Sequence, residues 1–267
     1  MIMQTNTYNP KNIPQLKWSG LIFLTILPVT WWFVIMYVIT PRLLPAITTH
    51  GGEINGYALN LITLSGYLFE FLLAMIVLRR EGLHFTWSDF RQRLNLRWGG
   101  WKTWVLFLFV FLAAFALTFP LISTSKTTAS LIPPPDWFPA SQNPLKEVNG
   151  IEDALPGIEF RGNTPFLILF LFTGVMNIIG EDTYYRGVLI PKLHGIFGRW
   201  AWLAGSLIFV LKHIYVWWRI QEVIPLAIAG AFLFGPVGSL PMAMLAHFLG
   251  NFGLTWPMVI KAVLFGN

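Results

Sequence analysis

Residues 164–191 read TPFLILFLFTGVMNIIGEDTYYRGVLIP, an apolar stretch that runs without a turn signal into Glu181, Asp182 and Arg186. The apolar pattern extends to residue 193, and a helix of that length spans ~45 Å, enough to cross a bilayer with a strong tilt. A charged side chain in hydrocarbon costs a few kcal/mol, so each of the three needs either an oppositely charged partner or a functional role. Asp182 and Arg186 are i,i+4 neighbours and neutralise each other. Glu181 points about 100° away, so the stretch predicts a membrane helix with one carboxylate that has no local partner.

The composition indicates an integral membrane protein. Hydrophobic residues make up 55% of the 267 residues and charged residues 11%, and the mean hydropathy is +0.61. Soluble domains carry about 25% charged residues. The chain has no cysteine, which excludes disulfides and a cysteine nucleophile. The net charge of +6 comes from basic residues in short connections, which indicates a lipid bilayer and no nucleic acid as the partner.

The hydropathy pattern predicts an all-α, polytopic protein with about seven transmembrane helices. The expected spans lie at residues 18–39, 57–78, 101–122, 164–193, 199–218, 223–234 and 240–263. We divide the chain into an arm with two helices and a basic loop (1–100), a third helix with a Pro-rich loop (101–163) and a helical core with the polar residues (164–267). The Pro-rich loop is long and net acidic, and we expect a disordered tether rather than a lid.

The positive-inside rule places the basic connections at residues 79–102 and 192–199 in the cytoplasm. With seven spans, the carboxyl terminus then lies outside. Glu70 falls inside the second expected span, where it is either a site residue or the partner of a charge on a neighbouring helix.

Three functional groups are expected at one depth. Glu181 and His213 each lie about 14 residues from the connection at 195–199, ~20 Å along a helix, and His247 lies ~18 Å beyond the turn at Gly235. His247 and Asn251 are i,i+4 neighbours and share a helix face. The sequence therefore predicts a polar intramembrane cavity, which we expect to open to the cytoplasm.

A carboxylate and a histidine can together hold and deprotonate a water molecule. A second histidine with an amide donor can stabilise the oxyanion of a tetrahedral intermediate. Such a set hydrolyses amides without a covalent intermediate or a cofactor. The sequence lacks HExxH, GxSG and GxGD motifs. Zinc held by Glu181, His213 and His247 stays open as an alternative.

Three motifs resemble those of the CAAX-protease and bacteriocin-processing (Abi, or CPBP) intramembrane endopeptidases. The EExxxR motif of that family appears as Glu181 to Arg186, with Asp182 in place of the second glutamate. The FxxxH motif matches Phe209 to His213, and the HxxxN motif matches His247 to Asn251. The resemblance covers about residues 164–251.

The resemblance implies a glutamic peptidase that cleaves a membrane-associated or lipidated peptide or protein. It implies that Glu181 and His213 activate water, that His247 and Asn251 form the oxyanion hole, and that Asp182, Arg186 and Phe209 support them. We expect a bacterial cytoplasmic membrane with the active-site cavity facing the cytoplasm. Two other functions stay open: a non-catalytic immunity or scaffold protein, and a transporter whose buried Glu–His cluster relays protons.

Overall fold

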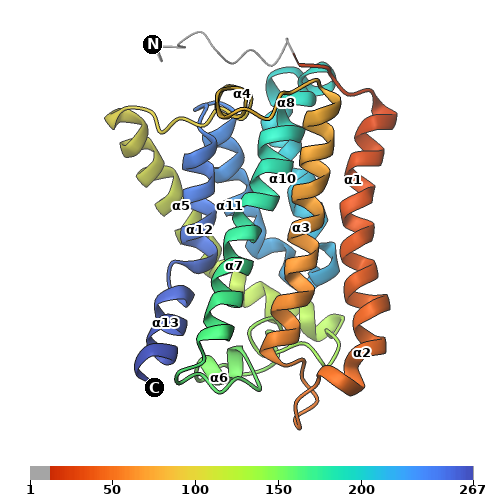
Figure 1. The fold of residues 1–267 in the computed structure, drawn as a ribbon, viewed down its shortest axis with the longest axis vertical. Coiled ribbons are helices and arrows are strands. Elements are labelled where there is room, and N and C mark those ends of the chain that lie inside the picture. The colour runs from red at the N-terminus through yellow and green to blue at the C-terminus, as the bar shows by residue number, and fades with distance from the viewer. Residues whose placement is uncertain (1–12, 267) are drawn as a thin grey trace.

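The chain forms a bundle of helices that stand side by side, as Figure 1 shows for residues 13–266, which the computed structural model describes. All named elements are helices, which confirms the all-α class. The longer helices are α1 (Trp18–Phe33), α3 (Gly56–Arg80), α5 (Trp101–Leu131), α7 (Thr164–Glu181), α10 (Ala201–Lys212), α11 (Ile220–Phe234), α12 (Leu240–Phe252) and α13 (Thr255–Phe265). The shorter ones are α2 (Thr40–Ile47), α4 (Trp87–Arg93), α6 (Ile151–Ala154), α8 (Ile190–Lys192) and α9 (His194–Phe197).

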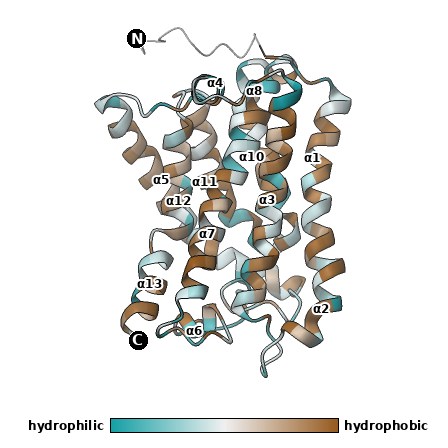
Figure 2. Cartoon of the chain, in the orientation of Figure 1, coloured by the Kyte–Doolittle hydropathy of each residue, from teal (hydrophilic) through white to brown (hydrophobic). Residues whose placement is uncertain are grey.

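The outer surface of the bundle is apolar. Figure 2 shows hydrophobic residues along the long helices, with hydrophilic residues gathered toward the two ends. On α5, Phe109 is 72% exposed and Leu117 is 61% exposed. Large apolar surfaces of this kind are not left in water, so the protein is an integral membrane protein whose helices face lipid.

By length and apolarity alone, fewer stretches of the described chain qualify as membrane spans than the seven expected. Five stretches of the described chain are long and apolar enough to cross a membrane: Trp18–Ile47, Gly56–Arg80, Trp101–Leu131, Thr164–Lys192 and His194–Phe234. A sixth is present if α12 and α13, bent by 55°, form one broken span. The stretch His194–Phe234 contains both expected crossings at 199–218 and 223–234, and the break at Val216 divides it into α10 and α11. Helices α10 and α11 are only ~18 Å and ~23 Å long, short of the ~30 Å of hydrocarbon, and they pack against each other around a break at Val216.

Two sets of connections mark the two ends of the bundle. At one end, which we call the basic end (residues 13–17, 81–100, 193–200 and 235–239), the Asn95 side-chain amide donates to the Gly238 carbonyl at 2.6 Å. At the other, the acidic end (residues 48–55 and 132–163), the Ile54 amide donates to the Trp137 carbonyl at 3.0 Å. In Figure 1, α4 and α8 lie at the basic end, whereas α6 and the end of α13 lie at the acidic end.

The acidic-end loop is packed, so the expectation of a disordered tether is wrong. Phe138 is fully buried, and its ring meets the Trp218 ring edge-on with centroids 5.0 Å apart. The Trp218 indole donates to the Gln142 carbonyl at 2.7 Å. Lys146 forms an ion pair with Glu53 across the same end. Aromatic burial and the indole hydrogen bond hold the loop against the helices despite its proline content.

Glu81 links three helices at the basic end. It follows α3 and accepts from Arg93 Nε at 2.7 Å and from Lys192 Nζ at 2.9 Å. Burial alone would raise the pKa of Glu81, but the hydrogen bonds and charges of Arg93 and Lys192 outweigh it and hold the pKa below its usual value. This carboxylate therefore joins α3, α4 and α8.

We expect Glu81→Gln to lower stability at neutral pH by about 1.5–3 kcal/mol, because it weakens two charge-assisted hydrogen bonds. A lowered folded-state pKa gives stability that is present above the usual glutamate pKa and is lost as pH falls through the lowered value. The difference between Glu81→Gln and the unmodified protein should therefore shrink as pH falls below about 4. Thermal unfolding in detergent across that range measures it, and a difference independent of pH would contradict the assignment.

Candidate functional site

The EDxxxR motif lies where one helix changes its winding. Helix α7 begins after Asn163, whose side chain accepts from the Phe166 amide at 3.2 Å, and ends at Glu181. A π-helical segment, Asp182–Leu189, follows, and all its residues are buried. Such segments are rare and occur frequently at functional sites. Gly180 lets α7 approach α3, because a Cβ at this position would lie 2.5 Å from the Tyr67 carbonyl oxygen.

Glu181 has a partner that its own helix could not supply. Its Oε1 atom pairs with the ammonium of Lys212 at the end of α10, and both side chains are almost completely buried. The same ammonium lies 3.7 Å from Glu70 Oε1 on α3 and 4.9 Å from the Trp32 ring centroid. Within residues 13–266, the other oxygen of Glu181, Oε2, has no hydrogen-bond partner.

Glu70 is paired with a neighbouring span, one of the two outcomes left open from the sequence. Its Oε1 atom accepts from the Trp32 indole at 2.9 Å and from the Tyr185 hydroxyl at 3.3 Å. Like Glu181, it is absent from the residues that line the cavity described below. Glu70 thus completes a buried pairing of two carboxylates around Lys212.

Asp182 pairs with Arg186, as the i,i+4 spacing predicts. The guanidinium lies 4.8 Å from the Phe209 ring centroid, and Gly230 gives it room, since a Cβ there would lie 2.6 Å from Arg186 Nη2. Asp182 has a second contact that the sequence did not reveal: its Oδ2 lies 3.1 Å from His247 Nδ1. Asp182 therefore both neutralises Arg186 and orients a histidine.

The HxxxN pair on α12 forms a hydrogen-bonded chain. Because a carboxylate only accepts, His247 Nδ1 carries a proton and donates to Asp182. His247 Nε2 then accepts from Asn251 Nδ2 at 3.0 Å, and the same amide also donates to Asn177 Oδ1 at 3.1 Å. His247 Nε2 also lies 3.6 Å from Glu181 Oε2. Both adjacent carboxylates of the motif thus reach one imidazole.

His213 borders the same region from the end of α10. Its Nδ1 atom lies 2.9 Å from the Phe209 carbonyl, which only accepts, so Nδ1 carries the proton. Nε2 is then the nitrogen with the free lone pair, on a side chain that lines the cavity. Phe209 fixes the position of both histidines, with ring centroids 4.8 Å from His213 and 5.9 Å from His247.

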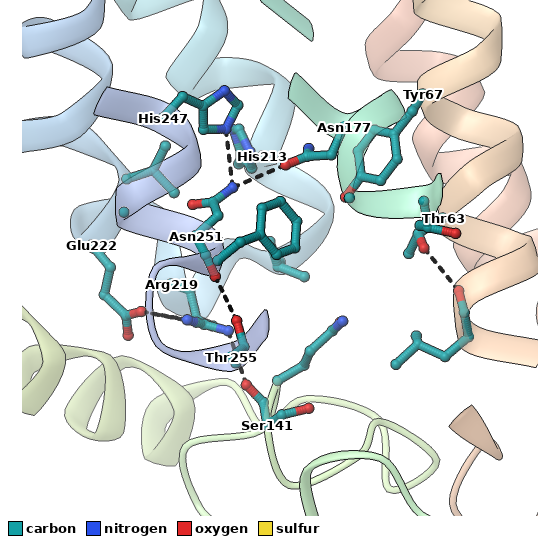
Figure 3. A pocket seen from close by; sticks show the side chains of 18 of the residues that line it. Thr63, Tyr67, Ser141, Asn177, His213, Arg219, Glu222, His247, Asn251 and Thr255 are labelled. Carbon is teal, nitrogen blue, oxygen red and sulfur yellow. Dashed lines mark hydrogen bonds and ion pairs between the residues drawn. The ribbon is translucent and has the colours of Figure 1, made fainter. Parts of the chain in front are cut away.

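A cavity of about 500 Å³ lies beside these groups. His213, His247, Asn251 and Asn177 line it, and Figure 3 shows it continuing past Arg219 and Thr255 to Ser141. Ser141 belongs to the acidic end, so the cavity extends away from the basic loops.

The expected site residues come from α7 and the π-helical segment that follows it, from α10 and the residue after its end, and from α12. Sequence reasoning missed Lys212 as the partner of Glu181, and Asn177 as the partner of Asn251. The signal for Lys212 was available: a lysine within an apolar span needs an anion, and Glu70 and Glu181 were the carboxylates without local partners. No pattern pointed to Asn177, which lies four residues before Glu181 on a mainly apolar helix.

The donor arrangement does not suit the alternative zinc site at Glu181, His213 and His247. Within the described part of the chain, no three His, Asp or Glu side chains form a group that could hold a metal ion. Both nitrogens of His247 are engaged, and the Lys212 ammonium occupies one oxygen of Glu181. A cation next to that ammonium would be repelled.

Residues 163–253 match the family model of the Rce1-like type II CAAX prenyl endopeptidases. The matched segment contains all three motifs, and it confirms the resemblance that the motifs indicated. It covers α7 to α12 and leaves the first three long helices outside the match. No curated protein and no solved structure matches the chain.

Proposed function

From the match to a membrane protease family, we propose that this protein is an intramembrane endopeptidase that hydrolyses a peptide bond of a membrane-associated peptide or protein. The observation that carries the proposal is Glu181 Oε2, a buried carboxylate oxygen without a hydrogen-bond partner among residues 13–266, 3.6 Å from His247 Nε2. An unpaired buried polar atom is costly, and such atoms cluster at sites that bind or react.

The proposed mechanism assigns water activation to Glu181 and His213. Glu181 Oε2 accepts a proton from water, while His213 Nε2, with its free lone pair, holds the water from the cavity side. The hydroxide attacks the peptide carbonyl, and the electron pair moves to the carbonyl oxygen. The proton on Glu181 is later available for the leaving amine, so protons balance over the cycle.

Oxyanion stabilisation by His247 and Asn251 needs a change from the resting hydrogen bonds. Both amide protons of Asn251 are engaged, so the substrate carbonyl must displace Asn177 or His247 as acceptor. His247 Nε2 donates only after it gains a proton. The one proton that Glu181 takes from water can pass to His247 Nε2, 3.6 Å from Glu181 Oε2, and it returns to Glu181 before it is transferred to the leaving amine. Asp182, on the opposite side of the ring, would stabilise the resulting imidazolium.

One observation favours a second candidate, the non-catalytic immunity or scaffold protein. The ammonium of Lys212 is paired with Oε1 of the proposed base, so this carboxylate is already neutralised by a buried ion pair. A protein that only binds a membrane partner would lose nothing by this pairing.

The experiment that tests the function compares the membrane peptides of cells with and without the protein, followed by cleavage of the enriched sequences by the purified protein in liposomes. We expect cleaved termini that depend on the protein. Binding of the same peptides without cleavage would instead support the scaffold function.

We expect cleavage to survive dialysis against a strong zinc chelator, since the proposed chemistry uses only side chains. Metal analysis of the purified protein before and after dialysis is the accompanying measurement. Stoichiometric zinc that is lost together with activity, and restores activity when added back, would overturn the metal-independent mechanism.

A further inference from the structure

The two ends of the bundle differ in charge. The basic end and the adjoining helix ends carry Lys17, Arg79, Arg80, Arg91, Arg93, Arg97, Lys102, Lys192 and Arg199 against Glu81 and Asp89. The acidic end and its adjoining helices carry Arg42, Lys126, Lys146, Arg161, Arg219 and Lys261 against Glu53, Asp136, Glu147, Glu152, Asp153, Glu159 and Glu222. Short loops rich in lysine and arginine remain in the cytoplasm. The charges therefore orient the basic end toward the cytoplasm.

The cavity reaches only the acidic end. The acidic-end residues among its lining are Ser141, Gln142, Ile151, Ala154 and Leu155. Within the described chain, no lining residue comes from the basic end as defined above. Asn251, beside the polar cluster, is exposed, so the cavity is not sealed.

A packed apolar core separates the polar cluster from the basic end. Tyr184, Val188 and Leu189, which follow the motif carboxylates on the π-helical segment, are completely buried. They share one core with Leu78 at the end of α3 and Leu240 at the start of α12. A peptide could not reach Glu181 from the basic end without opening this core, at a cost of several kcal/mol for each large side chain displaced.

We propose that the cavity receives its substrate from the non-cytoplasmic side of the membrane, so that the substrate is a peptide segment displayed on that face. That the occupant of the cavity is a substrate rests on the proposed peptidase function. The side of the membrane from which it enters rests on the charge distribution and the cavity geometry. It reverses the expectation that the cavity faces the cytoplasm.

The cavity wall suits an extended peptide segment. Its uncharged polar side chains include Asn60, Thr63, Thr118, Thr173, Asn177, Asn251 and Thr255, together with Ser141 and Gln142 at the acidic end. Amides and hydroxyls both donate and accept, as peptide backbone requires. Thr173 Oγ1 is buried and has no hydrogen-bond partner among residues 13–266. About 500 Å³ is in the range that encloses a small ligand, so a few residues of peptide fit and a folded domain does not.

The absence of cysteine from the sequence permits a direct test by single-cysteine labelling. Thr63→Cys places a thiol on the cavity wall, Ser141→Cys places one at the acidic end, and Ser88→Cys places one on exposed α4 at the basic end. A membrane-impermeant maleimide is applied to intact cells and to inside-out vesicles. The unmodified protein, which has no thiol, is the background control.

We expect Thr63→Cys and Ser141→Cys to react in intact cells at least tenfold faster than Ser88→Cys, and the order to reverse in inside-out vesicles. Reaction of Ser88→Cys in intact cells, with Ser141→Cys reacting only in inside-out vesicles, would overturn the proposal. Reaction of Ser141→Cys from outside with Thr63→Cys unreactive from that side would also overturn it, because the cavity would not be accessible.

Labelling does not require catalysis, so the experiments test the orientation of the cavity and the peptidase function independently. Outward labelling of a protein that cleaves nothing overturns the peptidase function and keeps the orientation. Cleavage by a protein whose cavity labels only from the cytoplasmic side keeps the function and overturns the orientation.

Discussion

Glu181→Gln should abolish most cleavage, by ~10²–10⁴-fold, while the protein stays folded. The substitution keeps the size of the side chain and its ability to accept a hydrogen bond from Lys212, but it removes the proton acceptor at Oε2. The measurement is the single-turnover rate of peptide cleavage in liposomes, with thermal unfolding as the check on folding. Glu147→Gln, on the exposed acidic-end loop, is the matched control and should keep the full rate.

The neighbouring carboxylate distinguishes the two roles. Asp182→Asn leaves Arg186 as a buried, unpaired cation and should lower the melting temperature. Asp182→Glu restores the usual residue of the resembled family and should be tolerated if it can still reach Arg186. Full activity in Glu181→Gln together with a folded, inactive Asp182→Asn would mean that Asp182, through His247, is the group on which catalysis depends.

Lys212→Met should destabilise the protein by about 3–5 kcal/mol, because it leaves Glu181 and Glu70 as buried carboxylates without their shared cation. Methionine has a similar length and keeps the apolar contacts of the lysine stem. Unfolding in detergent, followed by temperature or denaturant, measures the loss. Lys126→Met, at an exposed position of α5, is the control and should change stability by less than about 0.5 kcal/mol.

A double variant tests the same pairing even if Lys212→Met fails to fold. Adding Glu181→Gln removes one of the two uncompensated charges, so the double variant should be more stable than Lys212→Met by about 1–3 kcal/mol. Equal stability of the single and double variants would show that the ion pair between Lys212 and Glu181 does not govern folding.

The membrane class and the local pairs of the site followed from the sequence alone. The 55% hydrophobic content requires lipid or a core too large for a chain of this length. The pairing of Asp182 with Arg186 and of His247 with Asn251 follows from helical spacing, since i and i+4 side chains are neighbours on any helix. The three motifs added the resemblance that the family model then confirmed.

The span count could not be settled in the same way. Hydropathy measures how well a segment tolerates lipid, and both α10 and α11 pass that measure. Whether each crosses the membrane depends on the break at Val216 and on the packing of the two helices against each other.

The tertiary structure also decided which charges meet and where the cavity opens. The pairs Lys212–Glu181 and Asp182–His247 join different helices, and no periodicity within one helix specifies its rotation against another. The depth of the motif residues was predictable from residue counts, but a depth does not indicate the direction of access. That direction depends on which half of the bundle is filled, and the large side chains of Tyr184, Leu189 and Leu240 fill the half toward the basic end.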